Sequence, residues 1–225
     1  MSDLGGGAVR ERGEGVVSDL PLGILQRIRQ PPPAVRAGER CELCAADIPD
    51  DHSHVVDLDD RGLRCACRPC ALLFTRQGAA GGRFRTVPDR YLQAAGFQLS
   101  PGQWDALQIP VSVAFFFRNS AVGEVGGFYP SPAGATECLL PLDAWAAIET
   151  ANPVVATVEP DVEAVLLRVA PPGFECFIVP IDACYELVGH LRRLWRGFDG
   201  GREAHDQIAA FFAAVRGRAK VVPSG

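Results

Sequence analysis

Two Cys-x-x-Cys pairs limit what this chain can fold into more than any other feature of its sequence. Cys41 and Cys44 form the first pair, Cys67 and Cys70 form the second, and 22 residues lie between the pairs. Each pair makes a tight turn whose two sulfurs converge, so that two pairs supply the four ligands of a tetrahedral metal ion. The spacing therefore predicts a metal site made by these four cysteines.

The identity of the metal follows less directly from the ligands. Four thiolates leave no coordination position for a substrate, which predicts a structural Zn²⁺ that helps a small module to fold. Iron is the alternative, because thiolates also hold iron. Zinc is favoured, since the sequence contains no ferredoxin-like run of cysteines.

Three further side chains near the pairs are possible alternate ligands. Cys65 lies two residues before Cys67 and could replace it, or remain a free thiol beside the metal. His52 and His54 would share one face of a strand, so that one of them could complete a Cys3His set. The simpler interpretation leaves both histidines unligated, because four cysteines already complete a tetrahedral set.

The segment between the pairs has the pattern of a β-hairpin. Residues 54–58 and 62–65 are short strand candidates on either side of an Asp-Asp-Arg-Gly turn. A hairpin with a Cys-x-x-Cys turn at each end predicts a zinc-ribbon-like module over residues 39–76. Residues 70–74 are expected to begin a helical turn.

The remaining chain divides by composition. Residues 1–17 are rich in glycine and charge and have no apolar core, which predicts a disordered leader rather than a secretory signal. Residues 18–38 are expected to form a short helix capped by Asp19 and a linker stiffened by three prolines. Residues 84–217 are expected to form an α+β domain.

That domain is predicted from short apolar runs and two amphipathic segments. A helix is expected over 142–150, and two more near the C-terminus, the first capped by Asp182. Residues 129–137 are interpreted as an inter-strand loop, with contact to a partner as a second role. The strand candidates are residues 111–118, 124–129, 137–140, 163–169 and 175–179. The predicted fold class is α+β: a zinc-ribbon-like metal module, then a mixed sheet with C-terminal helices.

Charge and hydropathy argue against several classes of function. A net charge of −5 disfavours a nucleic-acid binder, and no apolar run approaches the ~20 residues of a membrane span. We therefore expect a cytoplasmic protein, where cysteine pairs more often bind metal than form disulfides. We expect no catalytic and no cofactor-binding residues, because Cys138, Cys176 and Cys184 lack a neighbouring histidine and acid and resemble small core residues.

Several segments together resemble a known family. They are Cys41-Glu-Leu-Cys44, residues 65–74, residues 129–137 and Trp195-Arg-Gly-Phe-Asp-Gly-Gly201. The chain resembles an uncharacterised bacterial family, mostly actinobacterial, whose genes lie beside those of nickel-iron uptake hydrogenases. The resemblance covers residues 40–215 and implies an accessory role in making, stabilising or wiring a hydrogenase, with a hydrogenase subunit or maturation factor as partner. It implies no activity and no catalytic residue.

The first expectation for function is a non-catalytic metal-binding accessory protein that acts through protein contacts. The alternative is a rubredoxin-like iron carrier that serves the hydrogenase. A third interpretation is metal delivery or sensing, in which Cys65, His52 and His54 are labile ligands. A DNA-binding ribbon is the least favoured, because of the negative net charge.

Overall fold

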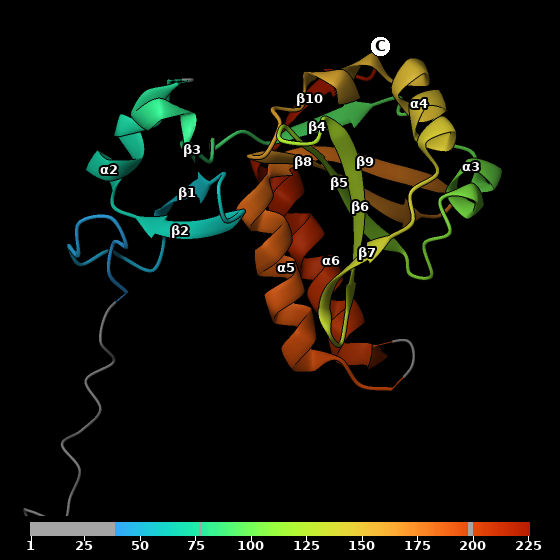
Figure 1. Ribbon diagram of the computed structural model, residues 1–225. Helices are drawn as coiled ribbons and strands as arrows, with labels where there is room; N and C mark the ends of the chain where they lie inside the picture. Colours follow the sequence, from blue (N-terminus) through green and yellow to red (C-terminus); the bar gives the residue numbers. More distant parts are fainter. Residues whose placement is uncertain (1–38, 77, 198–199) are drawn as a thin grey trace, which may run out of the picture. The chain divides into compact units, whose positions relative to one another are not determined.

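A computed structural model describes residues 39–76, 78–197 and 200–225, and these residues form two β-sheets with flanking helices (Figure 1). The predicted fold class is confirmed: a cysteine cluster near the N-terminus is followed by a mixed sheet and C-terminal helices. The predicted leader, the helix after Asp19 and the proline-rich linker lie outside the described residues.

The cysteine module, residues 39–86, is built on a small antiparallel sheet with the strand order β2-β1-β3. The predicted hairpin is confirmed, since β1 (Ser53–Asp57) and β2 (Gly62–Ala66) pair across the expected turn. A short helix, α2 (Arg68–Leu73), follows β2. β3 (Phe84–Thr86) was not predicted, because three residues are too few to show a strand period.

A larger sheet of seven strands has the order β10-β4-β9-β8-β5-β6-β7. It is a mixed sheet, because β10 and β4 pair in parallel whereas every other pair of neighbours is antiparallel. The strands are β4 (Leu92–Ala95), β5 (Val113–Asn119), β6 (Glu124–Ser131), β7 (Gly134–Cys138), β8 (Glu163–Ala170), β9 (Gly173–Pro180) and β10 (Lys220–Pro223).

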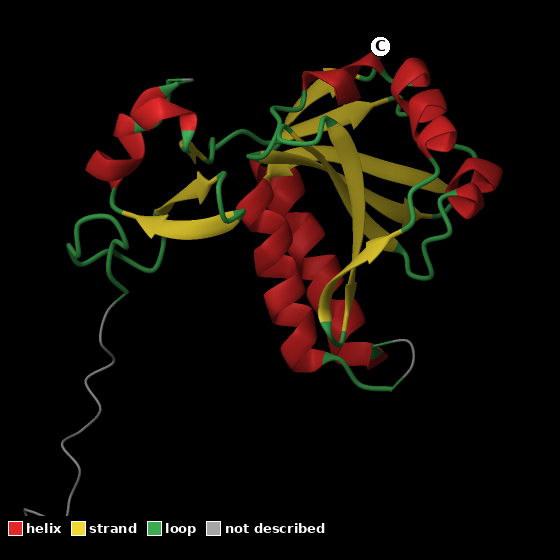
Figure 2. Cartoon of the chain, in the orientation of Figure 1, coloured by secondary structure: helices red, strands yellow, loops and turns green. Residues whose placement is uncertain are grey.

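Helices cover both faces of this sheet (Figure 2). α5 (Ile181–Leu194) and α6 (Gly201–Arg218) pack on one face. On the other face lie α3 (Pro101–Ala106), α4 (Leu142–Ala151) and the 3-10 helix η2 (Pro153–Thr157). Because both faces are covered, the central strands are continuous apolar runs rather than alternating ones.

Neighbouring phenylalanines of β5 point into the two different cores. Phe115 is fully buried in the core under α5 and α6, where it contacts Phe128 with ring centroids 5.7 Å apart. Phe116 is fully buried in the opposite core and stacks on Trp145 of α4, with ring centroids 4.5 Å apart. A single strand therefore ties both helical layers to the sheet.

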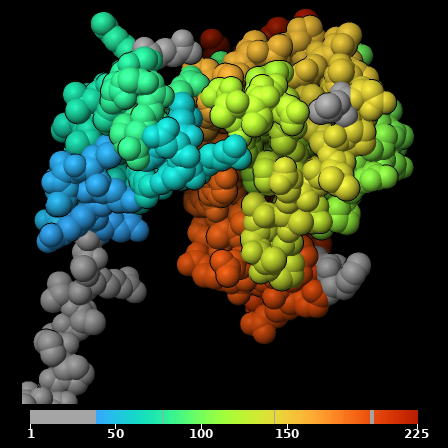
Figure 3. Space-filling model, in the orientation of Figure 1, coloured from blue at the N-terminus to red at the C-terminus, as the bar shows by residue number. Residues whose placement is uncertain are grey.

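Two local predictions were wrong. Residues 129–137 form a hairpin rather than a loop, with Ser131 paired to Gly134, and this hairpin lies along α5 (Figure 3). Proline favoured a loop here, but β6 pairs with β5 only as far as Phe128, so that Pro130 has a strand neighbour on one side only. Asp182 does not cap α5, because the helix begins after Pro180.

A buried asparagine at the end of α4 carries a stability prediction. Asn152 is fully buried; its Oδ1 accepts from the Gln98 N–H at 2.7 Å, and its Nδ2 donates to the Gln98 carbonyl at 2.9 Å. Asn152→Ala leaves these backbone groups without their partner, so we expect a loss of about 2 kcal/mol in the free energy of unfolding. Urea denaturation measures the loss, with the exposed Thr150→Ala as control. Equal stability of the two variants would contradict this account.

Candidate metal centre

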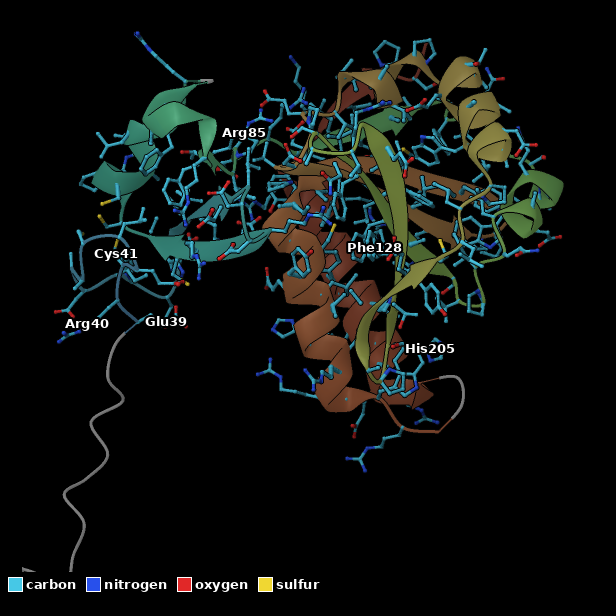
Figure 4. All side chains as sticks on the ribbon, viewed as in Figure 1. Glu39, Arg40, Cys41, Arg85, Phe128 and His205 are labelled. Atoms are coloured by element: carbon cyan, nitrogen blue, oxygen red, sulfur yellow. The ribbon has the colours of Figure 1, made fainter. Side chains whose placement is uncertain are left out.

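The first cysteine pair lies in a tight loop at the start of the described chain, where Cys41 is buried beside Glu39 and Arg40 (Figure 4). The Cys41 N–H donates to the Ala46 carbonyl, and the Ala45 N–H donates to the Cys41 carbonyl, both at 2.8 Å. Ala45 adopts a left-handed φ of 61°, which lets the chain reverse direction. The turn predicted for a Cys-x-x-Cys pair is present.

The second pair is held by the start of α2. Cys67 is the N-terminal cap residue of this helix, and Pro69 occupies its first turn, where the fixed φ of proline suits a helix. The Ala71 N–H donates to the Cys67 carbonyl at 3.0 Å, which closes the turn that contains Cys70. The helix start therefore sets the separation of the two sulfurs.

The structure brings the four predicted cysteines together. Their Sγ atoms all lie within 4.8 Å of one another, and the Sγ atoms of Cys44 and Cys67 are 3.6 Å apart. Four sulfurs at about 2.3 Å from a central zinc would lie about 3.8 Å from each other. All four cysteines are free thiols. Four close thiols in this arrangement can hold one metal ion.

Without a cation, the environment of the cluster favours ionisation of Cys41 and opposes ionisation of Cys70. Burial opposes ionisation of Cys41, but hydrogen bonds from backbone N–H groups, that of Cys67 first among them, lower its pKa to about 6. Hydrogen bonds with the thiols of Cys67 and Cys44 raise the pKa of Cys70 to about 12. A bound cation would stabilise every thiolate at once, since it reverses the local balance of charge.

The three possible alternate ligands form a second, separate group. Cys65 Sγ and one ring nitrogen each of His52 and His54 lie within 4.8 Å of one another. Cys65 faces His54 across the β1–β2 hairpin. Burial, together with the charges of Glu39 and Glu42, raises the pKa of the Cys65 thiol. The structure thus places Cys65 with the histidines rather than within the group of four.

No pattern in the sequence identifies the side chain that orients His54. Its Nδ1 lies 2.8 Å from Asp182 Oδ2, at the start of α5. The two residues are 128 positions apart, so that only the tertiary structure brings them together. The other oxygen of the same carboxylate, Oδ1, accepts from the Ala183 N–H at 2.8 Å, so that Asp182 joins β1 to the start of α5.

The other cysteines lie in the large domain. Cys176 and Cys184 are buried in its two apolar cores, as predicted, and burial raises the pKa of both thiols. Cys138 is half-buried. A pocket of about 410 Å³ lies between the β1–β2 hairpin and β5–β6, with Leu63 and Tyr185 among its lining residues. No histidine or cysteine of the described residues lines this pocket, so it is separate from the thiol cluster.

The fold and the site define a mixed α+β protein with a candidate thiolate metal centre. The chain belongs to DUF5947, a family of unknown function, whose family model matches residues 40–219. No curated protein and no solved structure matches the chain. None of the helices in the described ranges is both long and apolar enough to cross a membrane.

Proposed function

We propose that the protein is a non-catalytic metal-binding accessory protein that acts through contacts with another protein. The observation that carries the proposal is the convergence of four thiol sulfurs within 4.8 Å. A site closed by four cysteines has no position for a substrate, and this points to a structural ion. We take that ion to be Zn²⁺, because zinc is the usual ion of such closed sites.

The module's apolar core is small enough to need the ion. The buried residues of its own core are Cys41, Ile48, Val55, Ala66 and Ala71, whereas Val56 is buried against Val162 and Ile181 of the large domain. A core of this size buries too little apolar surface to stabilise a module on its own, so the free energy of metal binding becomes free energy of folding. The ion would then keep the surface of the module in shape for a partner.

The surface beside the cysteines supports a protein partner. Leu72 and Leu73 on α2 are 57% and 67% exposed, and they follow Cys70 in the chain after the buried Ala71. Two exposed arginines flank the leucine pair in sequence: Arg68 precedes it and Arg76 follows it. Apolar side chains with cationic neighbours are typical of protein contacts. We propose a subunit or maturation factor of a nickel-iron hydrogenase as the partner, following the resemblance described above.

A rubredoxin-like iron carrier is the second candidate, and one observation favours it. Cys44 is exposed, and Cys67 and Cys70 are only half-buried, so that one edge of the cluster lies at the surface. Electron transfer needs such an edge, whereas a structural ion does not. Visible thiolate-to-iron absorption of the purified protein would favour this candidate over the first.

Hydrogenase activity in a host that contains both proteins tests the accessory role. Without this chain, we expect at least a severalfold loss of active hydrogenase. Wild type and the control Cys138→Ser should restore the activity, whereas Cys70→Ser should not, because its module lacks the ion. Undiminished hydrogenase activity without the chain would refute the proposed partner.

A further inference from the structure

We propose that His52, His54 and Cys65 form a second metal site that takes a zinc-class divalent cation and is distinct from the four-cysteine cluster. One nitrogen of each ring and the Cys65 sulfur lie within 4.8 Å of one another. The three residues come from the loop before β1, from β1 and from β2. Imidazole nitrogen and thiolate are the ligands that such cations prefer.

His52 is the strongest single observation for the site. Its Nδ1 lies 3.0 Å from the Pro49 carbonyl and 3.5 Å from Glu39 Oε2. Since both partners are acceptors, they select the tautomer that carries its proton on Nδ1, and this tautomer has its lone pair on Nε2. The side chain is only 7% exposed, yet Nε2 has no hydrogen-bond partner within the described part of the chain.

Burying a nitrogen without a hydrogen-bond partner is unfavourable, so a structure that retains one needs an explanation. The His52 and His54 ring centroids are 4.7 Å apart, and the closely packed rings belong to the same group as Cys65. A cation between these side chains would satisfy Nε2 of His52 by coordination.

His54 is oriented in the same way by a carboxylate. Its Nδ1 lies 2.8 Å from Asp182 Oδ2, which also places the proton on Nδ1 and the lone pair on Nε2. A histidine that donates its other N–H to a carboxylate is the usual arrangement around a metal ion, where the carboxylate fixes the tautomer and increases the basicity of the ligand. Both histidines therefore offer Nε2 as the ligand.

Cys65 completes the group with a thiolate. It lies directly opposite His54 in the β1–β2 register, and its backbone N–H donates to Glu42 Oε1 at 2.8 Å. Three protein ligands leave one position of a tetrahedral ion for water or a small ligand, in contrast to the closed four-cysteine site. The second site is thus the one where exchange of a ligand or of the ion itself is possible.

Native mass spectrometry of the full chain, reduced and titrated with Zn²⁺, counts the ions directly. We expect two ions for wild type and one ion for both His52→Ala and Cys65→Ala. The matched control His205→Ala, on α6, should retain two, because His205 lies outside the cysteine module and its Nδ1 contacts the Gly201 carbonyl of its own helix. The ion that remains in each variant shows that the module is still folded.

Asp182→Ala is a second variant that leaves all three ligands in place. We expect it to weaken binding of the second Zn²⁺ by 10–100-fold, as loss of an orienting carboxylate does elsewhere, with the first ion unaffected. The proposal is overturned if wild type binds a single ion, if Cys65→Ala still binds two, or if every ligand variant loses both ions together. None of these outcomes decides whether the four-cysteine cluster has its proposed role, which the Cys70→Ser hydrogenase experiment tests independently.

Discussion

Cys41→Ser is expected to yield a chain without bound metal whose cysteine module is unfolded while the larger domain remains folded. Cys41 is the buried member of the cluster and a proposed ligand, and serine offers a harder, far more weakly ionised oxygen in its place. Under the proposed function, folding of the small module depends on the ion, so that loss of the ion should remove the structure. His52, His54 and Cys65 lie in the same module, so both metal sites should disappear.

Elemental analysis and limited proteolysis measure this result. We expect cleavage within residues 39–86 and protection of residues 87–217, where the two large apolar cores contain no part of the cysteine cluster. Cys138→Ser is the matched control, because it removes a half-buried thiol that lies far from the cluster in sequence. A Cys41→Ser protein with full metal content and unchanged proteolysis would show that the four thiols are not the ligands.

Phe116→Ala is expected to cost the large domain about 4 kcal/mol in its free energy of unfolding, the typical loss for a buried aromatic side chain. Phe116 is fully buried and stacks on Trp145. Gly127 on β6 packs against it closely enough that a Cβ there would lie 3.0 Å from the ring. So tight an environment cannot collapse into the space left by alanine, and a cavity remains.

Urea denaturation followed by tryptophan fluorescence measures the loss, because Trp145 lies in contact with the removed ring. Leu139→Ala is the control; Leu139 is 91% exposed, and its removal should change stability by less than about 0.5 kcal/mol. A loss below about 1 kcal/mol for Phe116→Ala would contradict the packing between β5 and α4.

The fold was largely predictable where the residue pattern is local. The β1–β2 hairpin has its turn residues in sequence, and α5 and α6 have apolar residues at helical spacing. β4 and β10 were not predicted, although they pair in parallel at one edge of the sheet. Both strands have four residues, and their partners lie far away in the sequence, so that tertiary contact rather than local preference decides their structure.

In the candidate site too, the local pattern was predictable from the sequence and the long-range contacts were not. Spacing alone identified the four cysteines that the structure brings together. Spacing could not assign Cys65, because a position two residues before Cys67 is compatible with the four-cysteine cluster and with the histidine group. The register of β2 against β1 decides the matter by placing Cys65 opposite His54. Nor could spacing find Asp182, which approaches His54 only because α5 packs near the module.

Metal analysis of the purified full chain, combined with its visible absorption spectrum, tests the central claim most directly. We predict zinc bound to the wild-type chain, no visible absorption band, and complete loss of the zinc in Cys41→Ser. A wild-type chain that contains no metal and unfolds at the same temperature with and without added Zn²⁺ would contradict the assignment of Cys41, Cys44, Cys67 and Cys70 as a metal centre.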